Sequence, residues 1–168
     1  NGVAVIEAPY LKDTIDHTEF DQIYHEHLCY YSLTALSALF ARHDLRIVDA
    51  ERIPIHGGSL RVFVAPASSA EAISARVAAL LAEEAAWGVA DAAFYLAFGA
   101  KVEHLKANLR ELLAEIKAEG KRIAVYGASA KGSTLLNYFG LGQETLDYVV
   151  DRSTVKQGLY TPGTHLLI

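Results

Sequence analysis

Short apolar runs alternate with amphipathic stretches along the chain, and their spacing predicts a mixed α/β fold. Residues 3–8 form a short apolar run that Pro9 ends, which predicts a buried strand. Two more strands are predicted at residues 46–53 and 59–65. Because only residues 54–58 connect these two strands, we expect them to form an antiparallel hairpin.

Helical periodicity lies on both sides of this hairpin. Ser32 is expected to cap a helix, because its hydroxyl can accept a hydrogen bond from an unpaired helix amide. Ser69 is expected to cap a second helix that runs to Trp87, and Asp91 a longer one that ends at Gly120. Apolar residues keep a spacing of three or four along the longest helix, which predicts one buried face, formed by Phe94, Phe98, Val102, Leu105, Leu109, Leu112 and Ile116.

The pattern changes at Lys121. From here the predicted order is a strand at 122–126, a glycine-bounded loop at 127–132, the start of a helix at 133–139 and a strand at 146–150. A strand, a tight turn, a helix and a second strand are typical of a right-handed βαβ unit. We therefore expect the chain to contain two α/β pieces with a helical connector between them.

Composition and charge narrow the possible partners. The 168 residues are 52% apolar and carry a net charge of −5, which disfavours a nucleic-acid partner, because phosphate neutralisation needs clustered basic residues. No apolar run approaches the roughly 20 residues of a membrane span, and no signal peptide pattern opens the chain. The single Cys29 fits a reducing compartment, so we expect a cytoplasmic protein. The adjacent Glu83 and Glu84 are expected on a solvated helix face, and nothing specifies an oligomeric state.

Both ends of the chain suggest a piece of a longer protein. The sequence contains no Met and begins with Asn1 directly before a strand-like run. It ends in an apolar run, residues 166–168, with no polar tail. An excised piece is therefore the expectation.

The densest group of proton-handling side chains is Tyr24, His25, Glu26 and His27. A histidine titrates near neutrality and can remove and return a proton, a neighbouring Glu can orient it, and a Tyr hydroxyl can donate to a developing oxyanion. One alternative is a loop whose rings only pack on the tyrosines that follow. Another is a zinc site at His25 and His27, but no third ligand lies near in the sequence, so no metal site is predicted.

Residues 127–132 follow a strand and open a helix, where backbone amides and the helix dipole favour a phosphate. The loop matches neither the dinucleotide fingerprint, whose middle glycine would replace Ser129, nor the P-loop, in which Lys131 would follow Gly132. Asp151 lies where a Rossmann half carries its ribose-binding acid. The alternative is a glycine turn that serves only tight strand-to-helix packing.

The hairpin loop, residues 56–61, is the third candidate. Positive φ angles at its glycines explain Gly57 and Gly58 sufficiently. The His, Ser and Arg side chains around bare backbone suggest contact with a substrate as a second interpretation.

Together these segments resemble the S-adenosylmethionine-dependent sugar C-methyltransferase family, whose members methylate a carbon beside a ketone in nucleotide-activated deoxysugars. The matching stretches occur in family order and cover nearly the whole chain, at residues 5–10, 18–27, 56–61, 126–132 and 151–165. The resemblance implies an N-terminal zinc-binding domain, a central class I methyltransferase domain and a C-terminal Rossmann-like domain.

On this resemblance, residues 1–66 would end the methyltransferase domain with its antiparallel hairpin. Residues 67–120 would be a helical connector, and residues 121–168 the first half of the Rossmann-like, nucleotide-sugar-binding domain. The zinc cysteines and the acidic-glycine loop that cradles S-adenosylmethionine have no counterpart in the chain. We therefore expect this piece to be inactive alone.

The resemblance implies that His27 is the general base, with Tyr24 and Glu26 beside it in the active site. His27 would remove the proton beside the ketone, and the resulting carbanion would attack the methyl group of S-adenosylmethionine. A nucleotide-diphosphate sugar would contact Gly57, Gly58, Ser59, Arg61, Gly127, Ser129, Lys131, Gly132 and Asp151. The alternatives are a methyltransferase acting on a non-sugar ketone, an NAD-dependent oxidoreductase and a non-enzymatic nucleotide-binding module.

Overall fold

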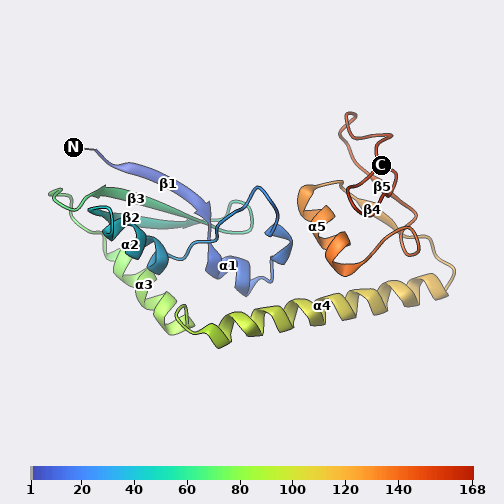
Figure 1. The fold of residues 1–168 in the computed structure, drawn as a ribbon, viewed down its shortest axis with the longest axis horizontal. Helices are drawn as coiled ribbons and strands as arrows, with labels where there is room; N and C mark the ends of the chain where they lie inside the picture. The colour runs from blue at the N-terminus through green and yellow to red at the C-terminus, as the bar shows by residue number, and fades with distance from the viewer. Residues whose placement is uncertain (1) are drawn as a thin grey trace. The chain divides into compact units, whose positions relative to one another are not determined.

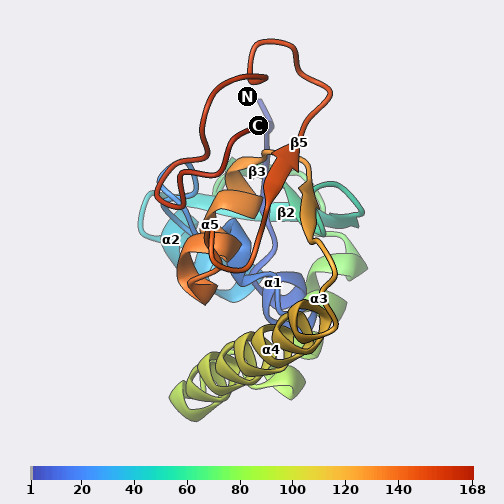
Figure 2. The same cartoon turned by 90° about the vertical axis from the view of Figure 1, so that its right-hand side faces the viewer.

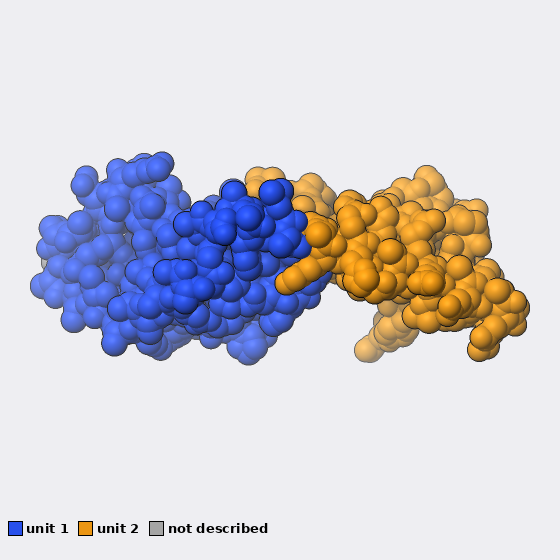
Figure 3. Space-filling model, turned by 90° about the horizontal axis from the view of Figure 1, so that it is seen from below, with its two compact units in different colours: residues 1–19, 29–98 blue, residues 20–28, 99–168 orange. Residues whose placement is uncertain are grey.

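The computed structural model describes residues 2–168, and its helices and strands are labelled in Figure 1. The chain folds into two compact units, which are coloured separately in Figure 3. Unit 1 comprises the residues up to Glu19 and Cys29–Phe98, and unit 2 comprises Phe20–Leu28 and Gly99–Ile168. The units are defined by packing, so the domain boundaries after residues 66 and 120 stay predictions.

An antiparallel sheet forms the centre of unit 1, with strands β1 (Ala4–Pro9), β2 (Leu45–Ile53) and β3 (Ser59–Pro66) in the order β1-β3-β2. The predicted hairpin is confirmed, because β2 and β3 pair antiparallel. Alternate β3 residues point to one face of a strand, and Leu60, Val62 and Val64 are all buried there.

Strand β1 exists as predicted, but the prediction that it is buried was wrong. Val5 is 58% exposed and Ile6 is 39% exposed. β1 is an edge strand of this sheet. An apolar run indicates which side chains favour burial, but it does not indicate what lies against them.

Helices α2 (Leu33–Ala41) and α3 (Ala75–Trp87) pack against β2 and against each other (Figure 1). Ser32 caps α2 as predicted, because its side chain accepts a hydrogen bond from the Ala35 amide at 3.0 Å. The core between the helices and the sheet contains Tyr10, Leu33, Leu36, Ile47, Ala50, Leu60, Val62, Val64 and Val77. The short helices α1 (Leu11–Asp16) and η1 (Phe20–Gln22) precede α2.

Helix α3 begins later than expected, with Ser74 and not Ser69 as its cap. The Arg46 guanidinium donates hydrogen bonds to the carbonyls of Ser69 at 2.7 Å and of Glu71. These bonds hold the chain after β3 outside a helix. Both serines can cap a helix, so only this tertiary contact distinguishes them.

Unit 2 contains the predicted βαβ unit, whose strands and helix are seen in Figure 2. β4 (Ala124–Tyr126) and β5 (Tyr148–Val150) pair in parallel, and α5 (Ala130–Phe139) connects them. Gly140 adopts the left-handed conformation that ends α5. With the antiparallel sheet of unit 1, this parallel βα arrangement confirms an α/β fold with a Rossmann-like half.

Helix α4 (Ala92–Ala118) is the longest element, and its residues from Gly99 onward belong to unit 2. The predicted cap is confirmed, because the Asp91 carboxylate accepts a hydrogen bond from the Ala93 amide. The predicted buried face is buried at Val102 and is otherwise half-buried or exposed. Among the described residues of α4 only Val102 is buried, and Leu112 is 51% exposed.

No helix within residues 2–168 is both long enough and apolar enough to cross a lipid bilayer.

Candidate active site

Tyr24 and His27 lie against each other in the segment that follows η1. A backbone hydrogen bond from the His27 amide to the Tyr24 carbonyl, 2.9 Å long, closes the turn between them. The two rings stack with centroids 4.8 Å apart, and the Tyr24 hydroxyl lies 3.5 Å from Nε2 of His27. Nδ1 of His27 is buried and has no hydrogen-bond partner among residues 2–168. The turn therefore places the Tyr24 phenol beside Nε2 of the His27 imidazole, while Nδ1 of the same ring makes no hydrogen bond among residues 2–168.

The other two members of the segment are exposed to solvent. The His25 ring meets the edge of the Tyr24 ring, with centroids 6.1 Å apart. The Glu26 carboxylate makes no hydrogen bond or ion pair in the described part of the chain. The structure thus brings Tyr24 and His27 together and leaves Glu26 apart. No group of three potential metal ligands occurs within residues 2–168.

Helix η1 attaches this segment to α5. The Phe20 ring stacks on the Phe139 ring at 5.0 Å and lies 5.7 Å from the Tyr138 ring. Phe20 and Phe139 are both buried. Because α5 begins at the loop 127–132, two candidate segments that lie a hundred residues apart in the sequence belong to one compact unit.

The loop 127–132 is held by hydrogen bonds to its own unit. Gly127 has a φ of +99° and donates its amide to the Val150 carbonyl at 2.7 Å. The Ser129 side chain caps α5 by accepting a hydrogen bond from the Gly132 amide at 3.0 Å. The first two amides of α5, those of Ala130 and Lys131, have no partner within a helix. Lys131 also forms no ion pair within the described residues, so its ammonium is available.

Asp151 contacts this loop directly. One carboxylate oxygen accepts a hydrogen bond from the Ala128 amide at 2.7 Å, and the other accepts from the Ser153 amide at 2.8 Å. Nζ of Lys156 donates to the Ala128 carbonyl at 2.7 Å and lies 3.5 Å from the carboxylate. The ribose-binding role of Asp151 stays a prediction, because its oxygens already accept bonds within the chain. Nothing in the sequence pattern pointed to Lys156.

Acidification is expected to release the Ala128 amide from Asp151. The Ser153 and Ala128 amides hold the pKa of Asp151 below its ordinary value of 3.8. A lowered pKa means that the interaction is present at neutral pH and is lost only as the pH falls through that lower value. The amide shift of Ala128, followed by NMR, should therefore titrate with a midpoint below 3.8. A midpoint at or above the ordinary value would contradict the contact.

The hairpin loop of unit 1 closes around acidic side chains. A β-carbon added to Gly58, whose φ is +140°, would lie 2.5 Å from Cβ of Asp13. One added to Gly57 would overlap the Glu19 carboxylate. The side chain of Ser59 is buried and donates to the Ile55 carbonyl at 3.0 Å. Packing within the chain therefore requires these glycines, and their contact with a substrate stays a prediction.

Arg61 projects from β3 and pairs within the sheet. Its guanidinium lies 3.0 Å from the Glu7 carboxylate on β1 and 3.8 Å from the Glu51 carboxylate on β2. Both neighbouring strands thus supply a negative charge to this side chain. Its proposed contact with a substrate is likewise untested.

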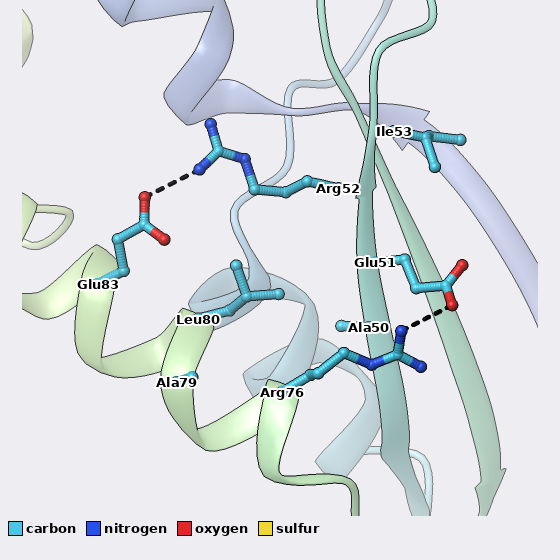
Figure 4. Close-up of a pocket in the computed structure, with 8 residues that line it drawn as sticks. All are labelled: Ala50, Glu51, Arg52, Ile53, Arg76, Ala79, Leu80 and Glu83. Atoms are coloured by element: carbon cyan, nitrogen blue, oxygen red, sulfur yellow. Dashed lines mark hydrogen bonds and ion pairs between the residues drawn. The ribbon is translucent and has the colours of Figure 1, made fainter.

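A cavity of about 400 Å³ lies between β2 and α3 (Figure 4). Two ion pairs border it, Arg52 with Glu83 and Arg76 with Glu51, each with 2.9 Å between nitrogen and oxygen. Its lining residues are Ala50, Glu51, Arg52, Ile53, Arg76, Ala79, Leu80 and Glu83. None of the predicted site residues lies in it, and its charges are mutually neutralised.

Sequence reasoning missed Glu84, which is fully buried and not solvated. Its carboxylate accepts hydrogen bonds from the Tyr10 hydroxyl at 2.9 Å and the Leu33 amide at 2.6 Å. Burial and the nearby Glu84 carboxylate raise the pKa of the Tyr10 hydroxyl. A signal was available, because Val77, Leu81 and Glu84 follow the spacing of one helix face, and that face packs on the core.

Two comparisons with known proteins give matches to this chain. A family model described as the C-methyltransferase C-terminal domain matches residues 54–168. The C-methyltransferase NovU of Streptomyces niveus is 40% identical over 168 residues, which make up all of this chain and 40% of NovU. The chain thus spans 40% of the length of that relative. The family model includes the hairpin loop, the loop 127–132 and Asp151, whereas the match to NovU also covers Tyr24 and His27.

Proposed function

Because this chain belongs to the C-methyltransferase family, we propose that it is part of an enzyme that methylates a carbon beside the ketone of a nucleotide-linked deoxysugar. S-adenosylmethionine is the second substrate in this proposal and supplies an electrophilic methyl group. The observation that carries the proposal is the contact between the Tyr24 hydroxyl and His27, attached through η1 to the helix that the loop 127–132 opens.

In the proposed reaction, His27 acts as the general base. A C–H bond beside a ketone can be broken at neutral pH only if the negative charge that moves to the ketone oxygen is stabilised. The His27 imidazole takes the proton, and the Tyr24 hydroxyl donates a hydrogen bond to the enolate oxygen. A new C–CH₃ bond then forms as the S–CH₃ bond of the donor breaks, and His27 later releases its proton to water.

The residues of this chain do not by themselves form the donor site. The acidic-glycine loop typical of class I methyltransferases is absent from these 168 residues. We therefore place the donor in a part of the enzyme beyond these residues. Glu26 has no contact with His27 in the structure, so its proposed role is limited to the neighbourhood of the substrate. No zinc ion takes part in the proposal.

The loop 127–132 is proposed to bind the diphosphate of the nucleotide sugar. The free amides of Ala130 and Lys131 point along the start of α5, where the helix dipole favours an anion. The Lys131 ammonium has no acidic partner among residues 2–168. The Ser129 hydroxyl can still donate a hydrogen bond, because as the cap it only accepts one.

Replacing Lys131 by Ala should weaken nucleotide-sugar binding about tenfold or more, because a charge-assisted hydrogen bond to phosphate contributes about 1.5–3 kcal/mol. The measurement is calorimetric titration of the full-length protein with a thymidine-diphosphate sugar. Lys121→Ala is the matched control, since Lys121 pairs with Glu119 in the same unit. Equal affinities for the two variants would limit the loop to a packing role.

The proposed function is tested by methyl transfer itself. The full-length protein should bind both S-adenosylmethionine and a thymidine-diphosphate keto-sugar, and mass spectrometry should detect one added methyl group on the sugar carbon. A methylated non-sugar ketone, with the nucleotide sugar unbound, would overturn the substrate proposal. Failure to bind S-adenosylmethionine would overturn the proposal that the protein catalyses methyl transfer.

A further inference from the structure

Both polar groups of the Ala128 backbone are held by the segment that follows β5. The Ala128 amide donates to Oδ2 of Asp151, and the Ala128 carbonyl accepts from Nζ of Lys156, each at 2.7 Å. Ala128 directly precedes Ser129, the residue that caps α5. All of these residues belong to unit 2. One short segment thus fixes the backbone of the loop 127–132 immediately before the helix begins.

A turn in this segment brings the Lys156 side chain back to the loop. The Lys156 amide donates to the Ser153 carbonyl at 3.0 Å, and the Gln157 side chain donates to the Asp151 carbonyl, also at 3.0 Å. The Asp151 carboxylate accepts in turn from the Ser153 amide at 2.8 Å. Nζ of Lys156 lies 3.5 Å from the carboxylate oxygen that holds the Ala128 amide. The lysine and the aspartate therefore act on Ala128 as a pair.

The contact with Lys156 also sets the direction of the next amide in the chain. The C=O and N–H groups of one trans peptide plane point in opposite directions, and the Ala128 carbonyl shares its plane with the Ser129 amide. Because the carbonyl points toward Lys156, the Ser129 N–H points away from that ammonium. This N–H donates no hydrogen bond within residues 2–168, so it is available to a ligand.

We propose that Lys156 is a positioning residue for the diphosphate site, which holds the Ala128 carbonyl and thereby directs the Ser129 amide toward the ligand. This role rests on the proposed function, in which the loop 127–132 binds the diphosphate of a nucleotide sugar. Backbone N–H groups attract an anion, whereas a carbonyl oxygen repels it, so the orientation of this one peptide decides its effect on binding. Lys156 acts through Ala128 and does not touch the nucleotide. Asp151, which holds the amide of the same residue, takes a positioning role in place of contact with ribose.

The test is Lys156→Met in the full-length protein, with thymidine diphosphate as the ligand. Methionine keeps an unbranched side chain and removes the ammonium, so the Ala128 carbonyl loses its partner. We expect the dissociation constant, measured by calorimetric titration, to rise about tenfold, as for the loss of one hydrogen bond to a charged group. The affinity for S-adenosylmethionine should be unchanged, because we place that donor beyond these residues. Circular dichroism checks that the variant is folded.

Hydrogen exchange of the Ala128 amide distinguishes positioning from direct contact with phosphate. Lys156 contacts both the Ala128 carbonyl and the carboxylate that holds this amide. Loss of the ammonium should therefore loosen the loop and speed exchange of the Ala128 amide severalfold before any nucleotide is added. A lysine that only contacts phosphate would leave this exchange rate unchanged in the free protein.

Two control variants accompany the test. Lys156→Arg keeps a cationic donor for the Ala128 carbonyl and should restore most of the affinity for thymidine diphosphate. Lys121→Met makes the same chemical change at a lysine of unit 2 that pairs with Glu119, and it should alter neither the affinity nor the exchange rate. If Lys156→Met does not fold, Lys156→Gln keeps a shorter, neutral donor and should show the same two changes by a smaller factor.

The outcomes separate the positioning role from the proposed function. Weaker binding of thymidine diphosphate together with faster exchange of the Ala128 amide supports the role of Lys156. Unchanged affinity would overturn it, and so would weaker binding with unchanged exchange, which would make Lys156 a direct ligand of phosphate. An equal loss of affinity for S-adenosylmethionine would indicate general damage to the fold and would also overturn it. A parent protein that does not bind thymidine diphosphate would overturn the nucleotide-sugar proposal itself.

Discussion

Replacing His27 by Asn should lower kcat for methyl transfer by about two to four orders of magnitude, which is the usual contribution of a positioned general base. Asn keeps a polar side chain of similar size but cannot accept a proton at neutral pH. Because the change removes the base and not the donor site, binding of S-adenosylmethionine should be unaffected. Timed methyl-transfer assays with the full-length protein measure kcat, and calorimetric titration measures the affinity for S-adenosylmethionine.

His25→Asn is the matched control for this experiment. His25 is two residues away and exposed, and its ring touches only the edge of Tyr24. Its replacement should leave kcat within a fewfold of the parent. Tyr24→Phe keeps the ring that stacks on His27 and removes only the hydroxyl 3.5 Å from Nε2, so its effect isolates the proposed oxyanion donor. Near-normal turnover of the His27 variant would remove His27 from the role of base.

Replacing Gly58 by Ala should lower the free energy of unfolding by about 3 kcal/mol, from backbone strain together with overpacking. The backbone at Gly58 has a φ of +140°, a conformation that residues with a side chain rarely adopt. The new methyl group would also lie 2.5 Å from Cβ of Asp13. This β-carbon is bonded directly to the backbone, so it has little freedom to move away. Chemical denaturation followed by circular dichroism measures the change.

Gly99→Ala is the natural comparison, because Gly99 lies inside α4 and an added β-carbon meets no atom within 4 Å. Alanine favours a helix over glycine by about 1 kcal/mol, so this variant should be as stable as the parent or more stable. If Gly58→Ala were equally well tolerated, the close approach of the hairpin loop to Asp13 would be incorrect.

Local features of the fold could be predicted from the sequence because they depend on interactions between nearby residues. The short connection between β2 and β3 requires an antiparallel hairpin, and the structure has one. Ser32 and Asp91 cap helices as predicted, since capping depends on a few adjacent residues. Ser69 failed as a cap because Arg46, more than twenty residues away, holds two carbonyls of its segment. A hydrogen-bond partner so far away in the sequence cannot be predicted from the residues next to Ser69.

The candidate site divides in the same way. The residue types of Tyr24 and His27 indicate proton transfer, and the position of the loop 127–132 between a strand and a helix indicates anion binding. The pairing of Tyr24 with His27 and not with Glu26 depends on a turn and on ring stacking. The attachment of this segment to α5 depends on Phe20 and Phe139, whose contact spans most of the chain.

Periodicity, caps and turns act over a few residues, so the order of the strands and of the longer helices, the βαβ unit and the residue types able to do chemistry follow from the amino-acid sequence alone. The short helices α1 and η1 were not predicted. Which polar groups satisfy one another depends instead on tertiary contacts. These contacts place the Glu84 carboxylate in the core among four hydrogen-bond donors, hold the Ala128 amide on the Asp151 carboxylate, and leave the apolar face of α4 only partly buried. A buried polar group is stable only with partners, and such partners come from anywhere in the chain.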